Sequence, residues 1–332
     1  MPSTTITIDQ VLHFARTIPE LVSLFPDAGW AQEPALTIAN DVMQRMLAQP
    51  MNWKWNRQYV APFCTVALQQ DYIGVQALYS TYPSIIDMGW LEACTRVDIN
   101  NTSIPKPLFP MEAVRDLQPI YMQAQPFGIC WVPVPLAIYG TWLANTLYPT
   151  GLGATTCPAS PIQQIIDSNG NYLFVSTWGT TGTTAPYAPM NATPGTTVSD
   201  GTVVWTVADP AGAALRMSTL PPSSGIVWSV YCVYQKKAPK LNSLTSLITP
   251  IPDDYSYLFR QGFISMLRKH QDAGDRKSVD AFQQWLLDLN TALRAADREQ
   301  QAFSFYPSSG ITGAGSFGYP LGPANPYAYG QW

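Results

Sequence analysis

Charged residues are scarce in this chain and unevenly distributed. They make up 12% of the 332 residues, roughly half the fraction that is usual for globular proteins. No Lys or Arg lies between Arg115 and Arg216, and residues 303–332 carry no charge at all. The segment 253–299, by contrast, mixes both signs densely. This distribution predicts helical ends of ordinary charge, a polar but uncharged β-rich middle, and a low-complexity tail.

The composition excludes two classes of protein. A net charge of −4 does not suit a nucleic-acid binder that works through bulk positive charge. An aromatic content of 12% argues against simple disorder. No signal peptide is visible at 1–9, and no run of about 18 apolar residues exists, so we expect synthesis in the cytoplasm without membrane insertion. An ordered protein with so few charged residues is typical of a protein that works outside the cell, or of one whose surface is permanently buried in an assembly.

Apolar residues recur at helical spacing at both ends of the chain. The first helix follows Asp9 as its N-cap and is broken or kinked at Pro19; the second begins at Pro34. Near the C-terminus, a helix starts around the acidic pair Asp253-Asp254 and a second runs over 277–300, which predicts an antiparallel pair. The apolar stripe of the last helix packs within the chain or, in part, against a neighbouring subunit. Its residues are Val279, Phe282, Leu286, Leu289, Leu293 and Ala296.

Strand patterns fill the middle of the chain. The segment 225–234 alternates two apolar faces, which predicts a strand buried on both sides. Asp200-Gly201 stands before alternating β-formers and predicts a hairpin. Turn signals flank residues 150–210, which we interpret as a small β module inserted into a loop of the main β domain.

The expected fold class is therefore α+β. It combines a helical bundle, built from the N- and C-terminal helices, with an antiparallel β-sandwich-like domain that carries the inserted small β module. The expected boundaries are 1–52 for the N-terminal helices, 53–149 and 211–250 for the two parts of the β domain, 150–210 for the module, 251–302 for the C-terminal helix pair and 303–332 for a Gly/Pro/aromatic tail arm.

The sequence offers little for catalysis, cofactors or metals. Its two histidines, His13 and His270, are expected to be helix residues, and no nucleophile-elbow, zinc-protease or phosphate-loop motif is present. Five cysteines without a CxxC pair predict small buried hydrophobes in a reducing compartment. They are Cys64, Cys94, Cys130, Cys157 and Cys232. We expect no enzyme activity, no cofactor and no metal ion.

Aromatic residues are the better candidates for binding. Trp178 and Trp205 of the module either stack on sugar rings or fill a small core. The tail, which cannot form a core of its own, is either a spacer or an arm that docks on another surface. The candidate assembly interface comprises Trp53, Trp55, Trp228, Tyr231, Phe303, Tyr319, Tyr327 and Trp332.

Several blocks, taken in their order, resemble tailed-bacteriophage virion proteins of the head-to-tail adaptor (connector, neck) type. The run Gly225-Ile-Val-Trp-Ser-Val-Tyr-Cys-Val-Tyr-Gln-Lys-Lys-Ala-Pro239 followed by Ile251-Pro-Asp-Asp-Tyr255 is similar to the final strand and helix start of such adaptors. Trp53-Lys-Trp-Asn56 and Gln69-Gln-Asp-Tyr72 resemble blocks of phage structural proteins. Adaptors of short-tailed phages are typically smaller and lack such an insert or tail.

The resemblance implies a homo-oligomeric, typically dodecameric, ring at the head–tail junction of the virion. Its partners would be the portal protein and tail tube, nozzle or fibre proteins, and genomic DNA would pass through without sequence-specific contacts. The alternative hypothesis is a tail or capsid-surface protein whose inserted β module binds glycan or host envelope. A virion-associated enzyme, such as a cell-wall hydrolase, is the third and least favoured hypothesis.

Overall fold

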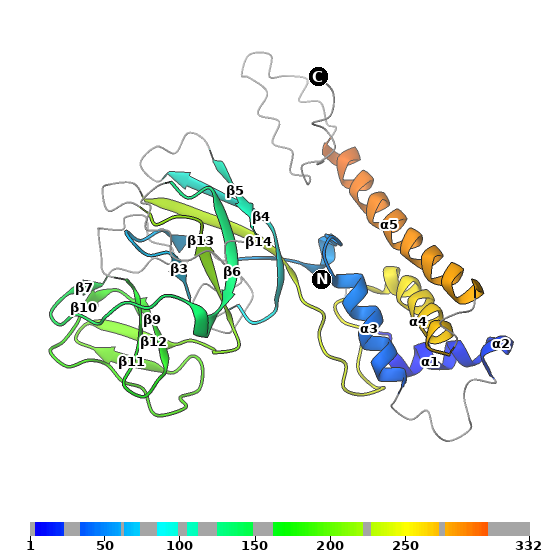
Figure 1. The fold of residues 1–332 in the computed structure, drawn as a ribbon, viewed down its shortest axis with the longest axis horizontal. Coiled ribbons are helices and arrows are strands. Elements are labelled where there is room, and N and C mark those ends of the chain that lie inside the picture. Colours follow the sequence, from blue (N-terminus) through cyan, green and yellow to red (C-terminus); the bar gives the residue numbers. More distant parts are fainter. Residues whose placement is uncertain are drawn as a thin grey trace, which may run out of the picture. The chain divides into compact units, whose positions relative to one another are not determined.

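The chain forms two compact units, each with its own core. The computed structural model describes residues 4–22, 34–60, 63–73, 85–98, 105–111, 125–148, 162–221, 227–271 and 276–304. The helical unit comprises residues 1–56 and 238–332, and the β unit comprises residues 57–237 (Figure 1). Helices and strands both contribute extensively, which confirms the expected α+β class.

The helical unit is built from segments of both ends of the chain. Its helices in the described ranges are α1 (Ile8–Arg16), α2 (Pro19–Val22), α3 (Ala35–Leu47), α4 (Ser256–Gln271) and α5 (Arg276–Ser304). The N-cap of α1 is Thr7 rather than the expected Asp9. The Thr7 hydroxyl accepts from the Gln10 N–H at 3.3 Å and the Gln10 side chain accepts from the Thr7 N–H at 3.1 Å, so a capping box fixes the start of the helix.

The acidic pair at the start of the C-terminal helices does not cap α4 as expected. Asp253 and Asp254 lie in a short 3-10 helix, and no side chain caps its N-terminus. The Asp253 carboxylate instead accepts from the Thr4 hydroxyl and from the N–H and hydroxyl of Thr5, at 3.0–3.1 Å. This carboxylate therefore holds the N-terminal segment of the chain against the start of α4.

The packing of α5 is centred on a tryptophan that the predicted stripe did not include. Trp285 is 1% exposed and donates its indole N–H to the carbonyl of Leu258 on α4 at 2.9 Å. A Cβ at Gly262 would lie 2.5 Å from the Trp285 ring, so the glycine is what lets α4 approach it. Val279, at the start of the predicted stripe, is 37% exposed. The face that α5 buries contains Trp285, which the prediction did not include, together with four residues of the predicted stripe, Phe282, Leu286, Leu289 and Leu293.

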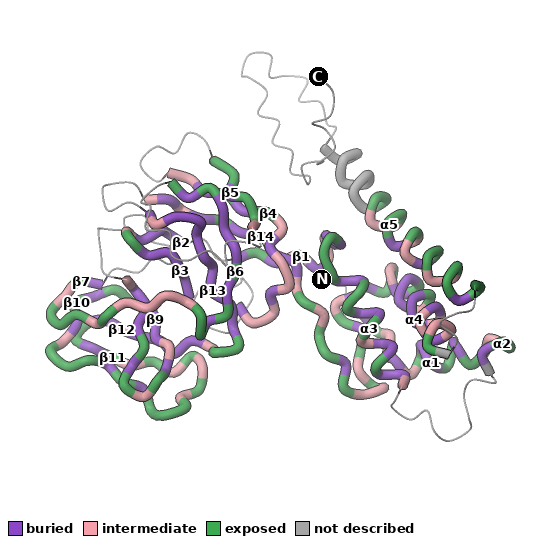
Figure 2. Tube along the Cα trace, in the orientation of Figure 1, coloured by how far each residue is buried: buried purple, intermediate pink, exposed green. Residues whose placement is uncertain are grey.

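The β unit contains a larger and a smaller sheet. The larger sheet has the strand order β1-β14-β4-β5-β6-β13-β3, with β2 also paired to β14. Its strands are β1 (Arg57–Tyr59), β2 (Phe63–Cys64), β3 (Asp71–Tyr72), β4 (Met88–Asp98), β5 (Lys106–Pro110), β6 (Gly128–Pro133), β13 (Ala213–Met217) and β14 (Trp228–Lys236). The described pairs are antiparallel except β5 with β6, and the sheet encloses an apolar core along its inner face (Figure 2).

The inserted module is a separate four-stranded sheet with the order β11-β12-β9-β8. Its strands are β8 (Gln164–Ile166), β9 (Tyr172–Thr177), β11 (Thr197–Asp200) and β12 (Val203–Val207), and a further pair joins β7 (Leu147–Tyr148) to β10 (Gly179–Thr180). Trp142 and Tyr148 already pack into the core of the module. The module therefore begins before the expected boundary at residue 150.

Two further expectations differ from the structure. The segment 238–250 was expected to belong to the β domain, but Leu241 and Ile248 lie in the core of the helical unit.

The strand around Trp228 was expected to be buried on both sides. In β14 the residues Trp228 and Cys232 face the inner core, whereas Tyr231 on the other face is 43% exposed. Within the described part of the chain, the face of β14 that carries Tyr231 is only partly covered, and Gln235 is the residue buried on it.

Candidate functional site

The first two interface candidates lie inside the helical unit. Trp53 is 1% exposed, stacks on Trp55 with ring centroids 5.4 Å apart, and donates its indole N–H to the Met46 carbonyl at 2.6 Å. Trp55 is half-buried and also lies against Tyr255. Because both rings are used for packing within the unit, the structure does not bring them to an exposed interface.

The other candidates separate into buried, exposed and undescribed residues. Trp228 is 3% exposed and lies beneath the Arg96 guanidinium, whereas Tyr231, three positions on, points outward. Phe303 lies in the last turn of α5. The side chain of Phe303 and the whole of Tyr319, Tyr327 and Trp332 lie outside the described part of the chain.

The two module tryptophans have opposite environments. Trp205 is completely buried and donates its indole N–H to Asp200 Oδ2 at 3.2 Å, and Trp142 donates to the same oxygen at 2.7 Å. Of the two alternatives predicted for Trp205, the structure confirms core packing and excludes stacking on a sugar, because no face of its ring is accessible. Trp178 is 63% exposed and remains a candidate.

An uncharged surface covers the outer side of the strands around β14. We call it the exposed sheet face. It comprises Tyr59 on β1, Tyr231 and Val233 on β14, Ala93 and Thr95 on β4, and Pro107 and Phe109 on β5. The register brings these residues together, because Thr95 pairs with both Tyr231 and Pro107 and Val233 pairs with both Tyr59 and Ala93. Partners in register point to the same side of a sheet.

The aromatic residues of this face are well exposed. Phe109 is 61%, Tyr59 51% and Tyr231 43% exposed. At one end the face meets an ion pair between Arg57 and Glu92, in which Arg57 Nε lies 2.9 Å from a Glu92 oxygen. Contiguous exposed apolar surface marks sites of interaction with other proteins or ligands. The exposed sheet face is accordingly the strongest candidate for a binding surface in the β unit.

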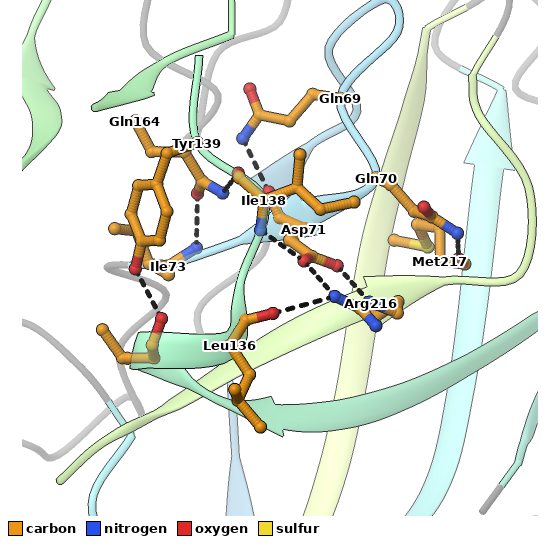
Figure 3. Close-up of polar contacts among 11 residues, drawn as sticks. Gln69, Gln70, Asp71, Ile73, Leu136, Ile138, Tyr139, Gln164, Arg216 and Met217 are labelled. Atoms are coloured by element: carbon orange, nitrogen blue, oxygen red, sulfur yellow. Dashed lines mark hydrogen bonds and ion pairs between the residues drawn. The ribbon is translucent and has the colours of Figure 1, made fainter. Parts of the chain in front are cut away.

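A buried ion pair lies at the opposite end of the larger sheet. Asp71 on β3 is completely buried, and both of its carboxylate oxygens lie 2.7 Å from nitrogens of Arg216 on β13 (Figure 3). Asp71 Oδ2 also accepts from the Ile138 N–H at 2.7 Å, and Arg216 donates to the Leu136 carbonyl at 3.1 Å. The hydrogen bond to Asp71 raises the pKa of Arg216, so the guanidinium stays charged.

Two pairs of adjacent glutamines extend this network toward the module. Gln69 accepts from the Gln163 N–H at 3.0 Å, and Gln164 accepts from the Ile73 N–H at 3.0 Å while its amide donates to the Ile138 carbonyl. Gln70 donates to the carbonyl of Met217 at 2.9 Å. We call Asp71, Arg216 and these four glutamines the polar hub. The hub joins the start of the module to the edge of the larger sheet.

Tyr139 lies beside the polar hub, between the hub and strand β9 of the module. The Tyr139 hydroxyl donates to the Val134 carbonyl at 2.5 Å, and its ring lies 5.3 Å from that of Tyr172 on β9. Burial, and after it the neighbouring Tyr172 and Asp71, raise the pKa of Tyr139. The phenol is therefore neutral and acts as a hydrogen-bond donor over the physiological pH range.

Reasoning from the sequence missed the polar hub. The signals were present: a Gln-Gln-Asp run at 69–71, a Gln-Gln pair at 163–164, and Arg216, which ends the long stretch without Lys or Arg. Nothing in the sequence indicates that these three segments meet, because 145 positions separate Asp71 from Arg216.

The comparisons with known proteins leave the family open. No protein-family model matches the chain, and no curated protein matches it. Among the residues that the structure describes, no group of three or more His, Cys, Asp and Glu side chains is arranged to hold a metal ion. Within the same ranges, no helix has the length and apolar character needed to span a membrane.

Proposed function

We propose that this chain is a structural virion protein of the head-to-tail adaptor type. In this proposal it assembles as a homo-oligomeric, dodecameric ring beneath the portal, extends the DNA channel without reading its sequence, and docks tail tube, nozzle or fibre proteins. It is made in the host cytoplasm and acts at the head–tail junction. Its contribution to genome ejection is mechanical, and no catalytic step belongs to it.

The exposed sheet face is the observation that carries this proposal. Seven uncharged residues lie side by side on strands β1, β14, β4 and β5, and three of them are aromatic side chains more than 40% exposed. Interface cores are depleted in charge and enriched in aromatic residues. A chain with only 12% charged residues and such a face fits permanent contact with a neighbouring copy.

The polar hub supports the same proposal from the mechanical side. A ring that transmits force needs subunits whose parts keep their geometry. The Asp71–Arg216 pair and the glutamines fix the module to the sheet, and both Asp71 oxygens and both amide atoms of Gln164 have defined partners. Buried polar networks that are satisfied in this way favour one arrangement over alternatives.

The mass of the assembled protein tests the proposal. Native mass spectrometry and electron microscopy of the full chain, alone and mixed with a portal protein from the same source, should reveal a closed ring of 36.5 kDa subunits. A protein that stays monomeric at every concentration and never joins the portal contradicts an adaptor.

Charge substitutions on the exposed sheet face localise the contact. We expect Tyr231→Asp and Phe109→Asp to weaken ring assembly at least tenfold, because burying an unpaired charge in an interface costs several kcal/mol. Tyr187→Asp is the matched control, since Tyr187 is 64% exposed on the module and away from this face. Equal assembly by all three variants would place the ring contact elsewhere.

A second candidate function rests on Trp178. This side chain is 63% exposed on the module, as an aromatic platform for a sugar ring requires. In this alternative the chain is a tail or capsid-surface protein that binds glycan or host envelope. Trp178→Ala should then abolish adsorption of particles to cells while the module stays folded, and Tyr187→Ala is the control. Unchanged adsorption of the Trp178 variant contradicts the glycan hypothesis.

A further inference from the structure

Two of the cysteines face each other across the centre of the larger sheet. Cys94 on β4 and Cys232 on β14 are direct partners in the antiparallel register. Both side chains belong to the inner core of the sheet, with exposures of 4% and 2%. The Cys94 side chain lies close enough to Cys232 to contribute to the raised pKa of the Cys232 thiol. The chain thus places a pair of thiols from distant segments side by side in an otherwise apolar core.

The backbone geometry at this position matches a cross-strand disulfide. The Cys232 carbonyl accepts from the Val60 N–H at 2.9 Å, on the side of β14 away from β4. Cys232 and Cys94 are therefore a non-hydrogen-bonded pair, in which the Cα atoms are about 4.5 Å apart. Disulfides span Cα separations of about 4.4–6.8 Å, so this pair lies at the short end of that range and can be bridged with little backbone movement.

We propose that Cys94 and Cys232 form an oxidative cross-linking site, which closes to a disulfide between β4 and β14 when the protein meets a peroxide. The inference is independent of the proposed function, since it depends only on the register of two strands. It assigns a chemical role to two residues that sequence reasoning expected to be inert core hydrophobes.

The chemistry balances with hydrogen peroxide as the oxidant. One thiol releases its proton and attacks a peroxide oxygen as the thiolate; the O–O bond breaks to give a sulfenic acid and a hydroxide, which takes up the released proton and becomes water. The second thiol then attacks the sulfenic sulfur, the S–S bond forms, and the sulfenic hydroxyl leaves as a second water with the proton of that thiol. Two thiols are oxidised by two electrons in total, and one peroxide is reduced to two waters.

Burial controls when this reaction occurs. Burial, and after it the contact with Cys94, raises the pKa of the Cys232 thiol well above its ordinary value, and thiolate is the reactive form. The pair therefore reacts slowly and stays reduced in a reducing cytoplasm. Once formed, the disulfide would cross-link two neighbouring central strands and enclose residues 95–231, including the whole module.

Differential alkylation tests the proposal on the native, full-length protein. The protein is treated with hydrogen peroxide, the peroxide is removed, and free thiols are alkylated after denaturation and identified by peptide mass spectrometry. We expect a peptide pair joined through Cys94 and Cys232 that has lost two hydrogen atoms, while Cys64 and Cys130 remain alkylatable. Cys130 is the matched control, because it is as deeply buried but pairs across the strand with Arg216. Full alkylation of Cys94 and Cys232, or a link from either to Cys157, overturns the proposal.

Variants give a second, independent readout. Peroxide should raise the thermal unfolding midpoint of the wild-type protein and of Cys130→Ala, and a thiol reductant should reverse the rise. Cys94→Ala should show no peroxide-dependent rise. A rise that persists in Cys94→Ala, or is absent from the wild-type protein, contradicts a Cys94–Cys232 cross-link.

Discussion

Asp71 carries a completely buried charge in the β unit. Its carboxylate is completely enclosed, and its bonds to Arg216 and to the Ile138 N–H satisfy both oxygens. An ion pair in this position is costly to assemble, yet removing one partner leaves the other charge buried without compensation. The Asp253 carboxylate of the helical unit makes hydrogen bonds that are mostly exposed.

Asp71→Asn should lower the free energy of unfolding of the β unit by about 3–5 kcal/mol, because it leaves the Arg216 charge unpaired. Urea unfolding of the variant and the wild-type protein measures the difference. Glu20→Gln is the control, since Glu20 pairs with Arg268 at 3.2 Å on the surface and such pairs contribute about 0–1 kcal/mol. A loss for Asp71→Asn no larger than that of the control would show that the hub is not structurally important.

Asp253 should make the helical unit sensitive to acid. The Thr5 N–H, the hydroxyls of Thr5 and Thr4, and Arg260 lower the pKa of this carboxyl. Its contribution to stability is therefore fully present above the unfolded value of about 3.9 and is lost as the pH falls through the lower folded value.

Urea midpoints of the helical unit from pH 6 to pH 2 check this expectation. Asp253→Asn should be less stable than the wild-type protein at pH 6, and the gap should close below about pH 4. Asp254→Asn, which leaves the Asp253 hydrogen bonds in place, should follow the wild-type curve. A gap that is the same at every pH contradicts the assignment.

Among the elements, the hairpin between β11 and β12 is the one whose turn was foreseen. Asp200 pairs with Val203, so Gly201 and Thr202 form a two-residue loop, and Gly201 has φ +61°. Helix α5 was foreseen together with most of its buried stripe, since Leu286, Leu289 and Leu293 pack in the core of the helical unit. Trp285 was not foreseen, and its large side chain fits the space opposite Gly262.

Gly201→Ala should destabilise the module more than Gly170→Ala does. Both glycines have positive φ, so alanine at either position costs about 1–2 kcal/mol of backbone strain. A Cβ at Gly201 would also lie 2.3 Å from the Thr180 carbonyl oxygen, whereas a Cβ at Gly170 meets open space. Hydrogen exchange of the module amides compares the two variants. Equal protection in both would mean that the steric contact at Gly201 relaxes without cost.

At the scale of the whole molecule, the first and last strands of the β unit are neighbours. Arg57 pairs with Gln235, so the chain enters and leaves this unit on neighbouring strands, and the helical unit is assembled from what precedes and follows. Each unit encloses its own apolar core. A unit with its own core and adjacent ends is expected to fold as an independent domain.

Calorimetry of the monomeric chain should therefore resolve two unfolding transitions. Asp71→Asn should lower the midpoint of one, and Trp285→Ala, which removes a large buried side chain at a cost of about 3–5 kcal/mol, should lower only the other. Leu287→Ala is the control for the helical unit, because Leu287 is 60% exposed. A single transition that both core variants shift equally would mean that the two units unfold together.

Local patterns in the sequence determined most of the elements. The apolar spacing around α3, α4 and α5, the alternation in β14 and the Asp-Gly turn of the module depend on residues within a few positions of each other. Hydrogen bonding and side-chain direction in helices, strands and tight turns are set over that range. The division into α and β segments was readable for the same reason, as was the burial of Cys64, Cys94, Cys130 and Cys232.

Only the tertiary structure decided which residues from distant segments meet. It paired Asp71 with Arg216 and Cys94 with Cys232, turned Tyr231 outward and Trp228 inward, and enclosed Trp205 while leaving Trp178 exposed. A shift of one residue in register would exchange the two faces of a strand, and such a shift leaves the local pattern of a strand with two apolar faces unchanged. The sequence by itself therefore determined the elements and the lack of charge, while the packing of the strands determined the exposed sheet face, the polar hub and the thiol pair.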